Sequence, residues 1–162
     1  MEQCKVVVVL TVEPEVRDAF IAGAPPNWQV FLGDAFSNEE EVIKQSQDAD
    51  FLLISGAAHP KRRYPDQIVQ GAKLKLIQTI GQGTDHIPMR LAFERGIPVA
   101  NSGGANAIWV AEHTILLMLA VMRRLLPSVE TIRQGVKYSD LIGREYFHSL
   151  YEKTVGIVGL GN

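Results

Sequence analysis

Three short loops of small, polar residues each follow an apolar segment that we expect to be a β-strand. They are residues 55–58 (SGAA), 81–83 (GQG) and 101–104 (NSGG). Small residues let backbone N–H groups come close to a ligand, and convergent N–H donors are what a carboxylate or phosphate needs. If the preceding strands belong to one parallel sheet, the loops share the rim at which ligands bind in such sheets. The alternative is that the glycines only make tight turns.

A different glycine motif stands at residues 159–161 (GLG), after the apolar segment 154–158 (TVGIV). A strand followed by G-x-G is the first half of the G-x-G-x-x-G turn, which brings the backbone close to a dinucleotide pyrophosphate. The third glycine, the helix after it and the acidic residue expected about 20 positions further on are not in the sequence. We therefore expect half of a nucleotide-binding motif.

The four histidines do not form an evident catalytic set. His86 and His113 each follow an acidic residue at the start of an expected helix, and we expect structural roles for both. His59 lies beside loop 55–58 and close to a basic stretch, residues 61–63 (KRR), that could attract an anionic substrate. We favour a solvated loop there. No spacing typical of a Ser-His-Asp triad or a metal site stands out.

The first hundred residues alternate apolar strand segments with helical segments. We expect strands at residues 5–11, 28–32, 51–54, 74–80 and 97–100, and helices from Pro14 to about residue 23, at 37–47 behind a Ser37/Glu40 capping box, at 66–70 and at 88–95. This pattern predicts an α/β fold with a doubly wound parallel sheet. The first strand is apolar on both faces and should be interior, whereas Pro98 marks the last as an edge.

A long apolar helix is expected from Ala107, with Asn106 as its N-cap. Residues 115–122 are apolar on every face, so this part of the helix should be buried all round. A domain of this size seldom surrounds such a helix alone, and a second domain or subunit is the natural cover. Residues 127–153 read as an extended arm containing a short helix, and residues 154–158 as a strand that opens a second α/β unit.

The composition is that of an ordinary globular protein. Of 162 residues, 46% are hydrophobic and 21% charged, and the net charge of −2 gives no reason to expect nucleic acid or an acidic membrane as a partner. The single cysteine, Cys4, excludes an internal disulfide, which fits a cytoplasmic location. No segment reaches the ~18 apolar residues of a membrane span.

Three stretches resemble the D-isomer-specific 2-hydroxyacid dehydrogenase family. They are residues 74–87 (LKLIQTIGQGTDHI), 94–124, which contain the polar loop, Asn106, VAEH and the apolar helix, and 153–162 (KTVGIVGLGN). The resemblance implies a flavodoxin-like substrate-binding (catalytic) domain at residues 1–100. It also implies the truncated start of a Rossmann NAD(P)-binding domain at 101–162, with a dimerisation helix, an arm and the first Rossmann strand.

The resemblance assigns candidate site residues. For substrate it implies the backbone amides of Gln82 and Gly83 as holders of the carboxylate, a second loop of Ser55, Gly56 and Ala57, and Asn106 near the nicotinamide. For the cofactor, NAD or NADP, it implies Asn106, Val110, Gly159 and Gly161. The family's catalytic arginine, glutamate and histidine would lie beyond residue 162. Asn106 could instead be a helix cap only.

The resemblance implies the N-terminal part of an oxidoreductase that interconverts 2-oxo acids and D-2-hydroxy acids by hydride transfer. We expect a small 2-oxo or 2-hydroxy acid as substrate, a homodimer through the helix at 107–125 and the following arm, and no activity for this chain alone. One alternative is a formate dehydrogenase-like member, favoured by GQGTDH but disfavoured by SGAAHP in place of a Pro-Phe pair. Another is a complete, non-catalytic binding or dimerisation module. The sequence decides neither the hydroxy acid nor NAD against NADP.

Overall fold

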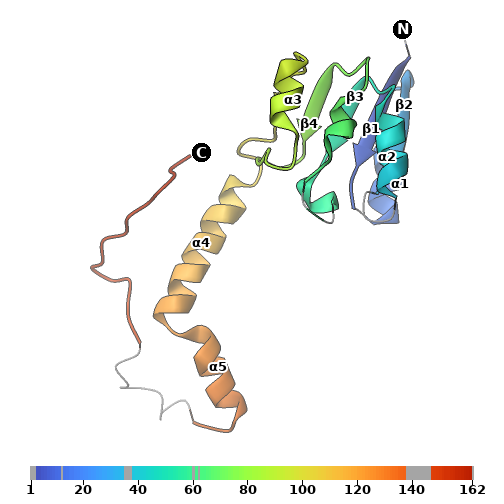
Figure 1. The fold of residues 1–162 in the computed structure, drawn as a ribbon. Coiled ribbons are helices and arrows are strands. Elements are labelled where there is room, and N and C mark those ends of the chain that lie inside the picture. Colours follow the sequence, from blue (N-terminus) through green and yellow to red (C-terminus); the bar gives the residue numbers. More distant parts are fainter. Residues whose placement is uncertain are drawn as a thin grey trace. The chain divides into compact units, whose positions relative to one another are not determined.

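The computed structural model describes residues 3–11, 13–34, 38–59, 61, 63–137 and 147–161. It divides into two compact units, Met1–Ala105 and Asn106–Asn162 (Figure 1). The first unit contains the sheet, and the second contains the long helix and the chain that follows it.

The first unit is built on a five-stranded parallel sheet with the order β2-β1-β3-β4-β5. The strands are β1 (Cys4–Val9), β2 (Trp28–Gly33), β3 (Phe51–Ile54), β4 (Leu76–Thr79) and β5 (Val99–Ala100). This is the strand order of flavodoxin-like sheets, so the predicted doubly wound fold is confirmed.

β1 lies inside the sheet because its valines suit a strand covered on both faces. It pairs with β2 on one side and β3 on the other, with Val9 opposite Gly33 and Ile54. Val6, Val7, Val8 and Val9 are all buried. At the far side β5 is an edge, as Pro98 predicts; the carbonyl of Pro98 accepts a hydrogen bond from the Ile77 amide at 3.0 Å.

The helices of this unit are α1 (Pro14–Gly23), α2 (Glu39–Ser46) and α3 (Met89–Glu94), with the 3₁₀ turns η1 (Gly56–Ala58) and η2 (Asp66–Val69). The predicted cap of α2 is wrong. The N-cap residue is Asn38, whose side-chain oxygen accepts a hydrogen bond from the Glu41 amide at 3.0 Å. An Asn side chain in this place satisfies one of the free N–H groups of the first turn. Ser37 lies outside the described residues.

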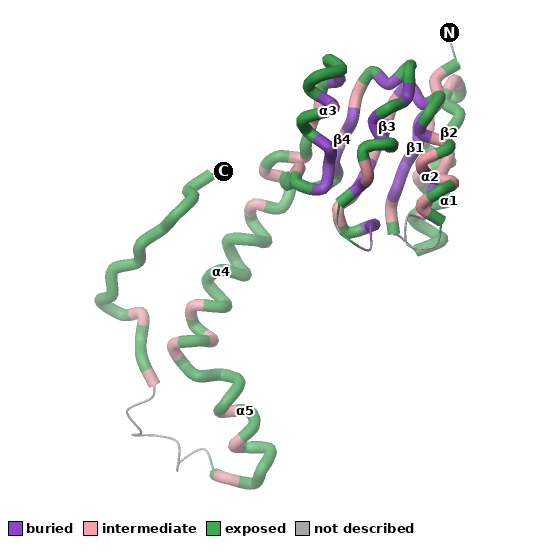
Figure 2. Tube along the Cα trace, viewed as in Figure 1, coloured by how far each residue is buried: buried purple, intermediate pink, exposed green. Residues whose placement is uncertain are grey.

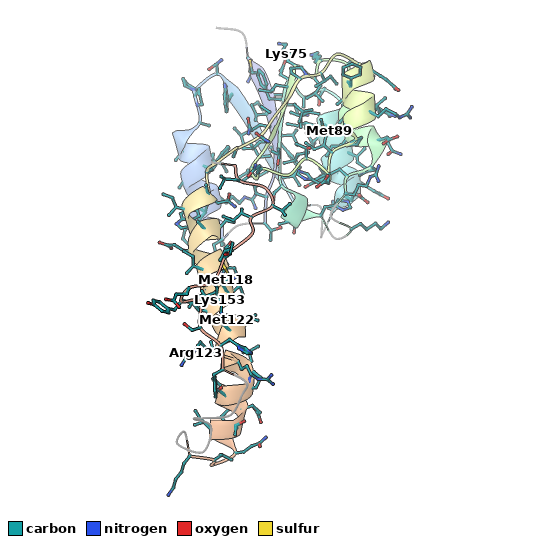
Figure 3. The ribbon with its side chains drawn as sticks, turned by 90° about the vertical axis from the view of Figure 1, so that its left-hand side faces the viewer. Lys75, Met89, Met118, Met122, Arg123 and Lys153 are labelled. Atoms are coloured by element: carbon teal, nitrogen blue, oxygen red, sulfur yellow. The ribbon has the colours of Figure 1, made fainter. Side chains whose placement is uncertain are left out.

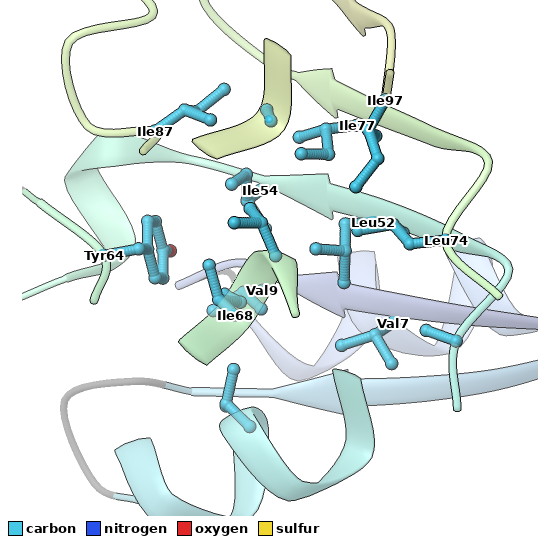
Figure 4. Close-up of a cluster of buried hydrophobic side chains, with 14 of the residues drawn as sticks. Val7, Val9, Leu52, Ile54, Tyr64, Ile68, Leu74, Ile77, Ile87 and Ile97 are labelled. Atoms are coloured by element: carbon cyan, nitrogen blue, oxygen red, sulfur yellow. The ribbon is translucent and has the colours of Figure 1, made fainter. Parts of the chain in front are cut away.

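One face of the sheet forms the core (Figure 4). Inward side chains of β1, β3 and β4 pack with residues of α2, η2 and α3, and the set consists of Val7, Val9, Val42, Ala49, Leu52, Ile54, Ala58, Tyr64, Ile68, Val69, Leu74, Ile77, Ile87, Ala92 and Ile97. On the other face Phe51, Leu53 and Leu76 are half-buried and line a cavity of about 380 Å³ beside Phe20 of α1. Buried and half-buried residues accordingly alternate along β3 and β4 (Figure 2).

In the second unit α4 (Ala107–Met122) begins where predicted, and α5 (Leu125–Arg133) follows. Arg124 separates them with a left-handed backbone, φ 48°. Asn106 occupies the N-cap position, but its side chain makes no capping hydrogen bond. Its backbone, at φ −115° and ψ 14°, is outside the extended region from which a cap side chain reaches the first turn.

Residues 115–122, which we expect a second domain or subunit to cover, are not covered by the described part of this chain, since no residue of α4 is buried. Large apolar side chains exposed along it are Ile108, Trp109, Val110, Ile115, Leu116, Leu117, Leu119 and Val121. Among the described residues, no helix is both long and apolar enough to cross a membrane.

The arm packs on the C-terminal half of α4. The His148 amide donates to the Met122 carbonyl at 2.8 Å, and the Arg123 guanidinium lies 5.9 Å from the centre of the Phe147 ring. Leu150 lines an apolar hollow with residues of α4. These include Met118 and Met122, which are labelled in Figure 3. The strand predicted at residues 154–158 is wrong, since no β-structure is found there. A parallel strand needs neighbours for its hydrogen bonds, and the described residues offer this segment none.

Candidate functional site

The three polar loops lie at the carboxyl ends of neighbouring strands: 55–58 after β3, 81–83 after β4 and 101–104 after β5. Two side chains connect the loop at 101–104 to β4 and to the loop that follows β4. Asn101 Nδ2 donates to the Gln82 carbonyl at 2.9 Å, and Ser102 Oγ donates to the Thr79 carbonyl at 3.2 Å. The Ser102 amide also donates to the Gly81 carbonyl at 3.2 Å. The structure thus brings these loops to one rim of the sheet.

The loop at 81–83 presents its N–H groups while its carbonyl groups are held from within. The hydroxyl of buried Thr79 lies 3.3 Å from the Gly83 carbonyl and 3.5 Å from that of Gly81. Gln82 and Gly83 are exposed, and no described residue accepts a hydrogen bond from either backbone amide. Two adjacent free N–H donors on a fixed backbone can receive a carboxylate.

The loop at 55–57 is held by its own side chain and by a neighbour. Ser55 Oγ accepts from the Ala57 amide at 3.2 Å and caps η1, so this amide is already used. The Ser55 carbonyl accepts from the Ala58 amide at 3.1 Å and from the Tyr64 hydroxyl at 2.8 Å. Ser55 therefore fixes the loop through hydrogen bonds to both its side chain and its carbonyl group.

Tyr64 was missed by the sequence reasoning, although it is 2% exposed and lies against Ser55. Its ring lies 4.9 Å from that of His59, and its backbone N–H donates to the His86 carbonyl at 2.9 Å. Burial raises the pKa of the Tyr64 hydroxyl, so it stays a hydrogen-bond donor. The surrounding sequence, KRRYPD, is polar and gives no signal that this aromatic residue is buried.

The prediction that His59 lies in a solvated loop is wrong. It is 2% exposed, its Nε2 lies 2.6 Å from Glu39 Oε1, and its Nδ1 accepts from the Lys61 amide at 3.1 Å. Because Nδ1 is the acceptor in the second contact, Nε2 carries the proton and donates a hydrogen bond to Glu39. Pro60 and Arg62 of the neighbouring basic stretch lie outside the described residues.

His86 packs against the loop at 55–57 from the other side. A Cβ added to Gly56 would lie 2.9 Å from His86 Nδ1, so only glycine fits there without a shift of the ring. Burial lowers the pKa of His86, partly opposed by Asp85. Its Nε2 is buried and has no hydrogen-bond partner among the described residues. A neutral ring that supports the loop fits this environment.

The remaining candidates, Asn106, Val110, Gly159 and Gly161, belong to the second unit. Asn106 and Val110 are exposed at the start of α4. Gly159 has φ +83°, the left-handed conformation for which a tight turn uses glycine, and nothing lies within 4 Å of a Cβ built at Gly159 or Gly161. Gly159 thus has a turn conformation, and both glycines leave open space through which a phosphate group could approach the backbone.

Metal binding finds no support in the described part of the chain, which contains no cluster of three His, Cys, Asp or Glu residues able to hold an ion. What the rim presents is a pair of exposed backbone N–H groups, next to buried and hydrogen-bonded side chains, and N–H groups of this kind can hold an anion.

Comparisons with curated proteins show what the chain is similar to. It is 36% identical over 125 residues to D-3-phosphoglycerate dehydrogenase of Methanocaldococcus jannaschii, covering 76% of this chain and 22% of that protein. It is also 36% identical over 124 residues to formate dehydrogenase of Pseudomonas sp. (strain 101), covering 76% and 29%. The chain thus spans less than a third of the length of either relative.

Solved structures share the fold. An NADPH-dependent glyoxylate/hydroxypyruvate reductase from Sinorhizobium meliloti matches with a TM-score of 0.71 and 23% identity, over 99% of this chain and 48% of that one. An NAD-dependent formate dehydrogenase from Staphylococcus aureus matches with a TM-score of 0.70 and 22% identity, over 90% and 46%.

The family described as D-isomer specific 2-hydroxyacid dehydrogenase, catalytic domain, matches residues 6–156. That range includes all three rim loops proposed from the sequence, Asn106 and the whole of α4. The chain therefore belongs to the D-isomer-specific 2-hydroxyacid dehydrogenase family.

Proposed function

We propose that this chain supplies the substrate-binding part of an NAD(P)-dependent oxidoreductase that interconverts 2-oxo acids and D-2-hydroxy acids by hydride transfer. One observation carries the proposal: the N–H groups of Gln82 and Gly83 are exposed on a loop fixed from within by Thr79 and from the side by Asn101. These donors would bind the carboxylate that every 2-oxo acid and 2-hydroxy acid carries.

The other candidate residues have complementary roles in this proposal. Ser55, Gly56 and Ala57 would close the other side of the substrate, and Asn106 would contact it with an amide that both donates and accepts. Residues 1–100 would form the substrate domain and residues 101–162 the beginning of the nucleotide-binding domain.

The cofactor would be NAD or NADP, since one structural neighbour is named as NAD-dependent and another as NADPH-dependent. When bound, its nicotinamide accepts or supplies the hydride. Gly159 and Gly161 would let the backbone approach the pyrophosphate, and Asn106 and Val110 would face the cofactor from the start of α4.

We expect the 162-residue chain to be inactive alone. His59 and His86 are buried beside the rim loops, where one is bound to Glu39 and the other is packed on Gly56. Neither offers a free, exposed acid or base to a substrate oxygen. Purified chain incubated with NADH or NADPH and pyruvate, glyoxylate or hydroxypyruvate should show no oxidation of the cofactor, whereas turnover would refute this expectation.

Carboxylate recognition can be tested by comparing pyruvate with methyl pyruvate, which has the same carbon skeleton but no negative charge. Calorimetric titration of the whole chain should show saturable binding of pyruvate and at least about tenfold weaker binding of the ester, because charge-assisted hydrogen bonds are lost. Equal affinities, or no binding of pyruvate, would contradict the proposal.

Formate is the second candidate substrate, because the formate dehydrogenase of Pseudomonas is as similar to this chain as the phosphoglycerate dehydrogenase is. Formate carries the carboxylate but no side chain. In competition against pyruvate, we expect formate to bind more weakly; tighter binding of formate would favour this alternative.

The apolar residues exposed along α4 support a homodimer through the helix at 107–125 and the following arm. A surface of this kind is larger than the isolated apolar residues that soluble monomers usually expose. Light scattering on the eluting chain should give the mass of two copies. A dimer that binds no pyruvate would favour the remaining alternative, a non-catalytic dimerisation module, whereas a monomer would contradict this part of the proposal.

A further inference from the structure

Behind the rim lies a buried group of aromatic and imidazole rings that the proposed function does not use: His59, Tyr64 and His86. They are 2%, 2% and 8% exposed. Tyr64 is the middle member, with ring centres 4.9 Å from His59 and 6.1 Å from His86. Burying three adjacent polar rings costs free energy, because each ring loses its contacts with water and needs hydrogen-bond partners in the protein.

Two of these rings, Tyr64 and His86, contact the loop at 55–57. The Tyr64 hydroxyl donates to the Ser55 carbonyl at 2.8 Å, and the same carbonyl accepts from the Ala58 amide at 3.1 Å. On the other side of the loop, the imidazole of His86 lies so close to Gly56 that a methyl group there would reach within 3.0 Å of two ring atoms. The loop is therefore fixed between a hydrogen bond and a ring.

Tyr64 is itself held at both ends. Its backbone N–H donates to the His86 carbonyl at 2.9 Å. Its ring lies against that of His59, which is anchored through Nε2 on Glu39 of α2 and through Nδ1 on the Lys61 amide. The hydroxyl thus has little freedom to leave Ser55.

We propose that Tyr64 is a positioning residue, which sets the backbone of Ser55, Gly56 and Ala57 in the orientation presented to the substrate. The inference rests on the proposed function, because it assumes that this loop faces the substrate. It adds a residue outside the rim that acts through the Ser55 carbonyl and touches no substrate atom.

The decisive variant is Tyr64→Phe, which removes the hydroxyl and keeps the ring. Amide hydrogen exchange of the whole chain should become roughly fivefold faster at Ala58, because its acceptor, Ser55, is then held by one hydrogen bond in place of two. The dissociation constant for pyruvate should rise by about the same factor.

Two control variants separate positioning from general loss of stability. Ile97→Val removes one methyl group from the core next to the amino end of β5, far along the strands from the rim. It should lower the unfolding temperature without changing the affinity for pyruvate. Tyr151→Phe removes a hydroxyl from an exposed tyrosine and should change neither property.

The outcomes distinguish this inference from the proposed function. If Tyr64→Phe leaves both exchange at Ala58 and pyruvate affinity unchanged, or if Ile97→Val weakens binding equally, a positioning role for Tyr64 is overturned while the proposed function stands. If the unmodified chain does not bind pyruvate, the proposed function fails, and the exchange measurement alone decides whether Tyr64 fixes the loop.

Discussion

The side-chain amide of Asn101 lies 2.9 Å from the carbonyl oxygen of Gln82, so a residue after β5 fixes the loop after β4. The contact occupies that carbonyl, while no described residue accepts a hydrogen bond from the backbone amides of Gln82 and Gly83. It joins residues 19 positions apart in the sequence and explains why an asparagine begins the loop at 101–104.

Two substitutions of Asn101 should therefore weaken pyruvate binding to different degrees. Asn101→Ala removes the donor and should weaken pyruvate binding about threefold to tenfold. Asn101→Asp also places a negative charge beside a carbonyl and a bound anion, so its effect should exceed tenfold. Titration calorimetry checks the order. Equal affinity for the two variants would mean that the charge is remote from the ligand.

Gly56 and His86 should be energetically coupled. Gly56→Ala places a methyl group about 2.9 Å from His86 Nδ1 and should lower the free energy of unfolding by roughly 1–3 kcal/mol through overpacking. Gly23→Ala at the end of α1, where nothing lies within 4 Å, is the matched control and should be close to neutral.

The coupling is measured in a cycle with His86→Ala. In that background the added methyl group meets no ring, so Gly56→Ala should cost clearly less in urea unfolding. The same cost in both backgrounds would show that the contact between loop and ring is not the source of the strain.

Much of this architecture is readable from the sequence because it depends on local pattern. Apolar runs between turn residues predicted all five strands, and Pro98 indicated the edge. The start of α4 followed from the change of a polar loop into an apolar helix. The rim loops followed from the rule that ligands meet the carboxyl ends of parallel strands.

What the sequence did not reveal depends on long-range contacts. Tyr64 and His59 stand among basic residues, and only the fold brings their rings together and buries them. Residues 154–158 have the composition of a strand, yet a strand forms only against neighbours, and none pairs with them in the described part of the chain. Local pattern cannot report either effect.

Asp50 should matter for stability, although it lies far from the rim. Its carboxylate accepts from the Lys5 backbone amide at 2.9 Å and from Lys75 Nζ at 2.9 Å, and so joins β1, β3 and the approach to β4. These two contacts lower the pKa of Asp50. Asp50→Ala should cost roughly 1–3 kcal/mol in chemical unfolding, because a backbone donor loses its partner.

Asp18→Ala, on the exposed surface of α1, is the comparison for Asp50 and should change stability by less than about 0.5 kcal/mol. The depressed pKa of Asp50 also means that its contribution is present above the ordinary value of 3.8 and is lost as the pH falls below it. Equal unfolding free energies for the two variants would contradict this account.

Titration of His86 should also make the protein less stable at low pH, although His86 is a base whereas Asp50 is an acid. Burial lowers its pKa from the ordinary value of 6.5, so the unfolded chain takes up a proton at a higher pH than the folded chain does. Stability should therefore be complete above about pH 6.5 and decrease as the pH falls below it. Unfolding midpoints measured between about pH 7.5 and pH 5.5 should fall less steeply for His86→Ala. An unchanged slope would rule out His86 as the titrating group.

The most direct test of the central claim is a residue-resolved titration of the chain with pyruvate, followed through its backbone amide resonances. Hydrogen bonding to a carboxylate should shift the signals of Gln82 and Gly83 most, with smaller changes at Ser55, Gly56 and Ala57, and methyl pyruvate should produce much weaker shifts. Saturable shifts confined to Lys61 and Arg63, or the absence of any shift at Gln82 and Gly83, would contradict the assignment of this rim as the carboxylate site.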